Sequence, residues 1–103
     1  MIMVRFINVF VANPTDLSFE FGRKWNLEKL NEQGIWFFPE TKYSSIIWEA
    51  DLFVDDNAPL LYCFRFPVGE YYYLSKGKYR IGKSFTPKGK NEINLYAEFE
   101  IGD

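Results

Sequence analysis

The segment Ile93-Asn94-Leu95-Tyr96-Ala97-Glu98-Phe99-Glu100-Ile101 decides the fold class of this chain. Apolar side chains occupy the odd-numbered positions, and polar side chains or tyrosine occupy the even-numbered ones. Successive side chains of a β-strand point to opposite faces, so this alternation predicts a strand with one buried face and one face in solvent.

The rest of the chain repeats this theme in shorter pieces separated by turn residues. The segments expected to form strands are 2–12, 17–21, 35–38, 45–54, 60–66, 71–74 and 79–81. Proline, glycine, asparagine and aspartate stand between them, most clearly at 13–16, 55–59, 67–69, 75–77 and 82–89. About seven to eight short strands with such spacing predict an all-β protein, a small antiparallel β-sandwich or barrel.

The segment 23–33 departs from the pattern. Trp25, Leu27 and Leu30 are unevenly spaced among polar residues, and Gly34 follows where a helix could close. We therefore expect at most one short helix, near 25–33, with an irregular connection as the alternative. The apolar start of the chain is broken by Arg5 and Asn8, which favours a first strand over a targeting peptide.

Size and composition narrow the class of protein. The 103 residues fit one all-β domain covering 1–103, and the 48% hydrophobic and 25% charged content is typical of a globular protein. No apolar run has the roughly 20 residues that a transmembrane helix needs. The net charge of −2 gives no general attraction to nucleic acid or anionic membranes. A lone cysteine, Cys63, favours a cytoplasmic protein, and we expect its thiol to be buried and inert.

Several chemistries are disfavoured because the chain has no histidine. Triads that use a histidine base, and zinc sites built from cysteine and histidine, lack their residues. No phosphate-binding glycine motif occurs, so we expect no cofactor and no enzymatic activity. A pair of carboxylates in a concave pocket remains the open enzymatic alternative. Oxygen ligands near 49–57 make a weak calcium candidate; they are Asp51, Asp55, Asp56 and Asn57, next to Glu49.

Segment 76–90 is the most suggestive local feature, since it holds six basic residues and no acidic one. Such a stretch with interleaved rings can contact an acidic protein, a phosphate backbone or an anionic lipid surface. The alternative is a plain strand with Lys78 and Arg80 facing outward and Tyr79 and Ile81 facing inward. The basic and aromatic candidates for partner binding in this segment are Lys76, Lys78, Tyr79, Arg80, Lys83, Phe85, Lys88 and Lys90.

Three consecutive tyrosines, Tyr71, Tyr72 and Tyr73, complete the candidate surface. Because neighbouring strand residues face opposite ways, at least one of these rings must point outward, where tyrosine makes good contacts. The tryptophans at 25, 36 and 48 are expected in the core or half-buried.

These observations predict a non-catalytic binding module. A protein partner with an acidic surface is expected first, with the chain acting as an inhibitor, immunity or accessory protein through its aromatic and basic surface. The alternative is a β-sandwich that recognises a carbohydrate, single-stranded nucleic acid or an anionic membrane surface. Exposed edge strands also leave a homodimer open.

Overall fold

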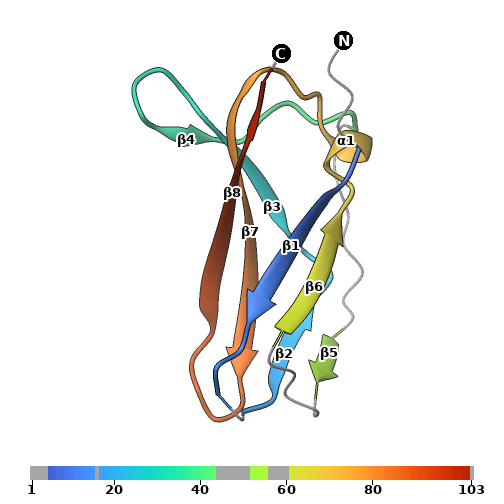
Figure 1. Cartoon of the computed structure of the whole chain (residues 1–103), viewed down its shortest axis with the longest axis vertical. Helices are drawn as coiled ribbons and strands as arrows, with labels where there is room; N and C mark the ends of the chain where they lie inside the picture. Colours follow the sequence, from blue (N-terminus) through green and yellow to red (C-terminus); the bar gives the residue numbers. More distant parts are fainter. Residues whose placement is uncertain (1–4, 16, 44–51, 56–60, 103) are drawn as a thin grey trace.

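The computed structural model describes residues 5–15, 17–43, 52–55 and 61–102. In these ranges the chain forms eight strands and one short helix (Figure 1). The elements are β1 (Ile7–Ala12), β2 (Phe19–Gly22), β3 (Asn26–Leu30), β4 (Trp36–Phe37), β5 (Leu52–Asp55), β6 (Leu61–Phe66), α1 (Val68–Tyr71), β7 (Gly77–Pro87) and β8 (Ile93–Ile101). All strand pairs are antiparallel, which confirms the predicted small all-β fold.

The strands form two layers. The larger sheet has the order β4-β3-β7-β2-β5, in which β3 and β2 pair with successive parts of one edge of β7. Strand β8 pairs along the opposite edge of β7. The smaller sheet is the β1–β6 pair, with a register from Ile7 opposite Phe66 to Ala12 opposite Leu61. Figure 1 shows β1 and β8 running in opposite directions, and they are not paired with each other. Within the described ranges, β1 pairs only with β6 and β8 only with β7.

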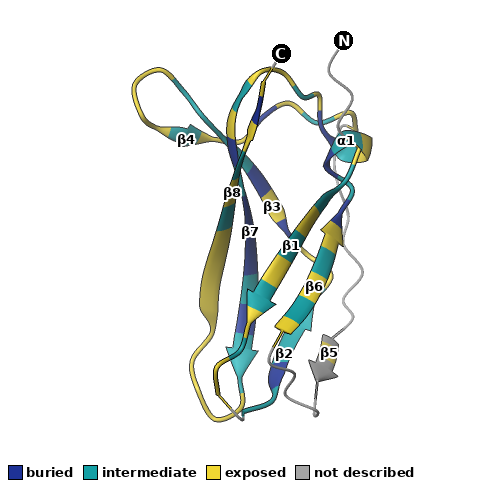
Figure 2. Ribbon diagram, viewed as in Figure 1, coloured by how far each residue is buried: buried dark blue, intermediate teal, exposed yellow. Residues whose placement is uncertain are grey.

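The core lies between the layers, toward the end of the molecule that carries α1 (Figure 2). Its buried residues are Trp25, Leu27, Phe66, Val68, Tyr72, Tyr79, Ile81 and Ile101. Tyr79 has no exposed surface, and its hydroxyl donates to the Ser75 carbonyl at 2.8 Å and accepts from the Ser75 amide at 2.9 Å. Both hydrogen bonds satisfy a polar group that would be costly to bury unpaired.

Aromatic rings join the layers at the opposite end. The Phe21 ring centroid lies 5.1 Å from that of Phe64 and 5.6 Å from that of Tyr62, with near-perpendicular ring planes in both pairs. Phe64 in turn packs 5.5 Å from the buried Phe85. Edge-to-face pairs add stabilisation beyond area burial. The high phenylalanine and tyrosine content is thus used largely for packing between sheets.

Two tryptophans have the burial expected of them, and the short helix lies elsewhere than predicted. Trp25 is buried and Trp36 half-buried, whereas residue 48 lies outside the described residues. The segment predicted as a helix near 25–33 contains strand β3, and the helix is α1. The reason is that β3 pairs with β7 and buries Leu27, while Trp25, two residues earlier and just before the strand, is buried as well.

Gly34 therefore serves a hairpin, not a helix end. It adopts a φ of 79° in the β3–β4 turn, a conformation that favours glycine. The side-chain oxygen of Asn31 accepts hydrogen bonds from the amides of Gln33 and Ile35, both at 2.9 Å. Asparagine commonly stabilises turns in this way.

Strand β7 is longer than the expected 79–81, because it continues through Gly82 to Pro87. Gly82 is tolerated inside the strand because the Tyr96 ring lies over it; a Cβ there would be 2.9 Å from Tyr96 Cε1. The prediction of a strand at 71–74 is wrong. Tyr71 ends α1, and Tyr72 makes only an isolated bridge to Thr41.

The buried face of β8 is only partly covered. Ile101 is buried and Phe99 is half-buried, but Ile93 is 43% and Leu95 39% exposed. Strand alternation set the face correctly, yet the six-residue strands β1 and β6 do not cover all of the nine-residue β8. Cys63 is exposed, contrary to expectation, because Tyr62, Phe64 and Phe66 take the inward positions of β6.

Candidate functional site

The structure divides the predicted surface residues into a buried and an accessible group. Tyr72, Tyr79, Lys83 and Phe85 are buried, so none of them offers an outward-facing contact surface. Tyr71 and Arg80 are half-buried. The exposed candidates are Tyr73, Lys76, Lys78, Lys88 and Lys90. The predicted aromatic and basic surface is therefore broken up by the strand alternation of β7, which turns its rings into the core.

The outward cations of β7 are engaged with glutamates of the neighbouring strands. Lys78 lies 3.4 Å from a carboxylate oxygen of Glu98 on β8. Arg80 Nε donates to Glu28 Oε2 on β3 at 2.6 Å, and this hydrogen bond raises the pKa of Arg80 above its ordinary value. The basic-outward, apolar-inward strand that we weighed as the alternative is thus present, with charge partners on β3 and β8.

Aromatic rings also hold Arg80 in place. Its guanidinium carbon lies 4.4 Å from the ring centroid of Trp36 and 4.3 Å from that of Tyr96. Guanidinium groups stack well on aromatic faces. Arg80 therefore fastens β4, β3 and β8 to β7 and is not offered to a partner.

Lys83 is the buried exception among the cations, at 9% exposure. It stands on the same face of β7 as Tyr79 and Ile81, where the ladder passes from β3 to β2. Its ammonium donates to the carbonyls of Gly22 at 2.6 Å and Lys24 at 3.1 Å. Burial lowers the pKa of Lys83 to about 8, because the charged form loses hydration.

The three tyrosines lie around α1. Tyr72 is buried, and this burial raises the pKa of its hydroxyl. Tyr73 is 57% exposed, so the expectation that at least one ring faces outward is confirmed. The Tyr71 ring packs 6.0 Å from that of Trp25.

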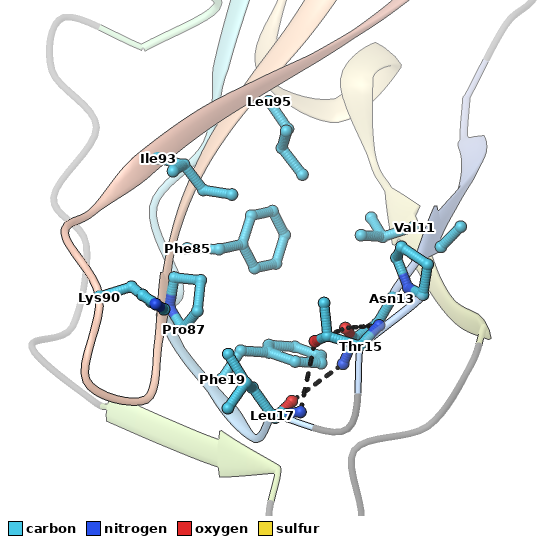
Figure 3. Close-up of a pocket in the computed structure, with 12 residues that line it drawn as sticks. Val11, Asn13, Thr15, Leu17, Phe19, Phe85, Pro87, Lys90, Ile93 and Leu95 are labelled. Carbon is cyan, nitrogen blue, oxygen red and sulfur yellow. Dashed lines mark hydrogen bonds between the residues drawn. The ribbon is translucent and has the colours of Figure 1, made fainter.

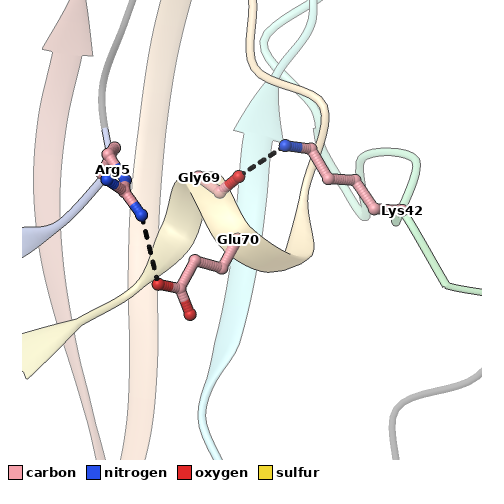
Figure 4. Close-up of polar contacts among 4 residues, drawn as sticks. All are labelled: Arg5, Lys42, Gly69 and Glu70. Atoms are coloured by element: carbon pink, nitrogen blue, oxygen red, sulfur yellow. Dashed lines mark hydrogen bonds and ion pairs between the residues drawn. The ribbon is translucent and has the colours of Figure 1, made fainter.

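Polar contacts fix α1 against the segments beside it (Figure 4). Arg5 lies 3.9 Å from a carboxylate oxygen of Glu70, and Lys42 Nζ donates to the Gly69 carbonyl at 2.7 Å. These groups are therefore accounted for by structural contacts of the helix.

The calcium candidate is left without support. Glu49, Asp51, Asp56 and Asn57 lie outside the described residues, and Asp55 ends β5, where it pairs with Phe19. Among the residues that the structure describes, no group of three acidic or cysteine side chains is placed to hold a metal ion.

A concave site does exist in a place that the sequence did not indicate, between β1 and the β7–β8 hairpin (Figure 3). Its cavity has a volume of about 300 Å³. The apolar side chains that line it include those of Val11, Leu17, Phe19, Phe85, Ile93 and Leu95. Figure 3 shows these residues arranged around the cavity, with Lys90 beside Pro87 at its border.

A second cavity continues the first along β1. It has a volume of about 190 Å³ and shares Val11, Ala12, Phe85 and Leu95 with its neighbour. It extends to Phe64 and Ile81, and to Ala97 of β8. We call the two together the β1–β8 groove.

The polar residues at the end of the groove are bonded to one another. Asn13 Nδ2 donates to the Leu17 carbonyl at 3.0 Å, and Thr15 Oγ1 donates to Asn13 Oδ1 at 2.7 Å. Since these groups are satisfied locally, the groove presents a mainly apolar lining, with Lys90 at its border and Lys83 on the wall of the second cavity. No aspartate or glutamate lines either cavity in the described part of the chain.

The outer face of β7 and β8 carries a more polar hollow of about 410 Å³, lined by Glu28 and Glu92 among others. The Glu28 carboxylate is already hydrogen-bonded to Arg80. This hollow is the only place among the cavities described here where two carboxylates share a wall, and one of them is committed to a structural contact.

Comparison of the chain with known proteins gives no match. No protein-family model matches the chain, and no curated protein or solved structure matches it significantly. In the described residues there is no helix with the length and apolar character required to cross a membrane.

Proposed function

We propose that this chain is a non-catalytic binding module that captures an extended segment of a protein partner in the β1–β8 groove. The observation that carries the proposal is that an exposed apolar lining lies beside the edge of β1. This strand edge has no partner in the described residues. A strand edge supplies backbone hydrogen bonds, and adjacent pockets supply side-chain specificity.

The geometry suits a peptide in β-conformation. Val9 and Val11 of β1 face the groove, and Ile93 and Leu95 of β8 form its other wall. A segment added along β1 would place every second side chain over Phe85 and Leu95. We therefore expect a partner segment with apolar residues at alternate positions and no central proline.

Charge sets the expected orientation of that segment. Lys88 and Lys90 are exposed in the turn between β7 and β8, and Lys90 lines the first cavity together with residues that follow β1. An acidic residue at this end of the partner segment would complement them. Exposed lysines act mainly on the rate and orientation of association, while the apolar contacts supply most of the affinity.

This proposal keeps the expected class of function and moves its site. The partner is still a protein with acidic character, and occupation of its segment would serve an inhibitor or accessory role. The contact surface is the apolar groove, with the predicted Lys90 at its border and Lys88 in the same turn.

The experiment is selection of random ten-residue peptides displayed on phage against the purified chain. Selected peptides are then measured against two matched variants, Ile93→Glu in the groove and Ile35→Glu in the β3–β4 turn. Ile93 is 43% and Ile35 61% exposed, so neither change buries a new charge.

We expect peptides with alternating apolar residues whose affinity falls at least tenfold with Ile93→Glu and is unchanged with Ile35→Glu. Equal binding to both variants, or no selected peptide, would contradict the proposal. Saturable binding of a glycan or an oligonucleotide, without peptide binding, would favour the ligand-binding alternative.

A further inference from the structure

The free edge of β8 is a second feature that invites association. This strand has nine residues, and within the described ranges one of its edges is unpaired. Natural edge strands are usually protected by charged side chains, above all lysine, or by proline, a bulge or short length. Residues 91–101 contain no lysine, arginine or proline, and the acidic residues among them are the only charged ones.

We propose that β8 pairs antiparallel with β8 of a second copy of this chain, about a two-fold axis at Ala97. The inference goes beyond the proposed function, because it concerns backbone pairing at the edge of β8 and not at that of β1, although Ile93 and Leu95 of β8 also line the groove. A symmetric dimer of this kind joins the two larger sheets into one continuous sheet.

The charge pattern of β8 selects this register. Side-chain alternation requires inward residues to face inward residues, which leaves only registers centred on a residue. Centring on Ala97 places Glu98 opposite Tyr96 and Glu100 opposite Asn94. No acidic residue of β8 then faces another.

Neighbouring registers bring like charges together. A centre at Glu98 sets that residue against its own copy, and a centre at Phe99 sets Glu98 against Glu100. Centres at Tyr96 and Leu95 bring Glu92 opposite Glu100 and Glu98, respectively. Directly opposed like charges destabilise a strand pair, so the register centred on Ala97 is preferred. It also pairs all nine residues of the strand.

The same register accounts for the exposed apolar end of β8. It places Ile93 opposite Ile101 of the second copy and Leu95 opposite Phe99 of the second copy. Ile93 and Leu95 are 43% and 39% exposed in the single chain. Phe99 is already held by its stacking on Tyr79, with centroids 5.4 Å apart. A buried or half-buried apolar side chain of the second copy therefore lies opposite each exposed one.

The register is tested by cysteine cross-linking in a Cys63→Ser background, because Cys63 is itself exposed. Ala97→Cys places two thiols directly opposite each other, at a spacing that a disulfide can bridge. Asn94→Cys is the matched control, because its symmetric counterpart lies far along the strand. A mixture of Asn94→Cys and Glu100→Cys chains is the positive test of the same register.

We expect a disulfide-linked dimer from Ala97→Cys and a mixed dimer from the Asn94→Cys and Glu100→Cys pair, but none from Asn94→Cys alone. Light scattering of the unmodified chain is expected to give twice the monomer mass, and Tyr96→Pro to give a monomer that keeps its β-type circular dichroism. Equal cross-linking of Ala97→Cys and Asn94→Cys, or a monomeric unmodified chain, would overturn the inference. A monomer that still selects peptides would refute this inference alone, and a dimer that selects none would refute the proposed function alone.

Discussion

The ammonium group of Lys83 donates a hydrogen bond to the backbone carbonyl of Gly22 at 2.6 Å, inside the aromatic layer of the fold. It lies 5.5 Å from the ring centroid of Phe21 and 5.6 Å from that of Phe64. The contact closes the corner where the chain leaves β2 and has not yet begun β3. Lys83 thus supplies a donor at a stretch of this edge of β7, between Gly82 and Thr86, that neither β3 nor β2 pairs.

The first prediction concerns the pH dependence of stability. The pKa of Lys83 is lowered from 10.5 to about 8 in the folded chain, so the unfolded chain binds more protons between these values. The free energy of unfolding is therefore expected to rise from pH 8 toward pH 10.5 as Lys83 loses its proton. Below pH 8 the full cost of burying the charged ammonium is present. Urea unfolding at several pH values, compared with Lys83→Met, isolates the effect. We expect a difference of about 1 to 3 kcal/mol between neutral and alkaline pH; parallel curves for the two proteins would refute it.

The second prediction concerns the hydrogen bond between Arg80 and Glu28. Both side chains are mostly buried, at 24% and 17% exposure, and Arg80 stacks between two rings. Arg80→Ala is expected to lower the free energy of unfolding by more than Lys78→Ala does. Lys78→Ala is the control, because its ion pair with Glu98 is exposed and worth less than about 1 kcal/mol. Equal losses in the two variants would show that Arg80 has no special role.

The third prediction concerns the buried Tyr79. Tyr79→Phe keeps the ring packing and removes the hydroxyl that exchanges two hydrogen bonds with the Ser75 backbone. We expect a loss of about 1 to 2 kcal/mol for this variant and about 3 to 5 kcal/mol for Tyr79→Ala, which also leaves a cavity. Thermal unfolding measures both. A Tyr79→Phe variant as stable as the parent would mean that water satisfies Ser75 equally well.

The fourth prediction concerns Gly82 and Tyr96. A methyl group at Gly82 would be 2.9 Å from Tyr96 Cε1, so the ring must move and its contact with Arg80 must loosen. Gly82→Ala is expected to cost about 1 kcal/mol in the parent and close to nothing when Tyr96 is already alanine. A double-mutant cycle by urea unfolding gives the coupling directly. Additive effects would show that the ring is not what requires glycine here.

Much of the fold follows from local chemistry in the sequence. The alternation in 93–101 predicts β8 and its inward face, and the proline and glycine clusters mark most of the strand ends. The prediction of a helix near 25–33 is wrong because short strands carry too few residues to separate a period of two from irregular spacing. Strand β3 exists because pairing with β7 satisfies its backbone and because Leu27 is buried beneath it.

The candidate surface shows the same limit. Gly82 in the sequence indicates the start of a turn and leaves Lys83 among the basic surface candidates, whereas the unbroken strand keeps Lys83 in phase with Tyr79 and Phe85. Because β7 continues past Gly82, Lys83 is a buried amine in the core and not part of a basic surface.

By itself the sequence determined that this chain forms an antiparallel, aromatic-packed β-protein without histidine chemistry, because strand periodicity and composition are local properties. The tertiary structure alone decided which inward faces stay uncovered. Strands of unequal length stack in two layers, and an apolar groove with Ile93 and Leu95 on its wall remains between β1 and the β7–β8 hairpin. That outcome depends on the relative placement of strands distant in sequence, which no local pattern encodes.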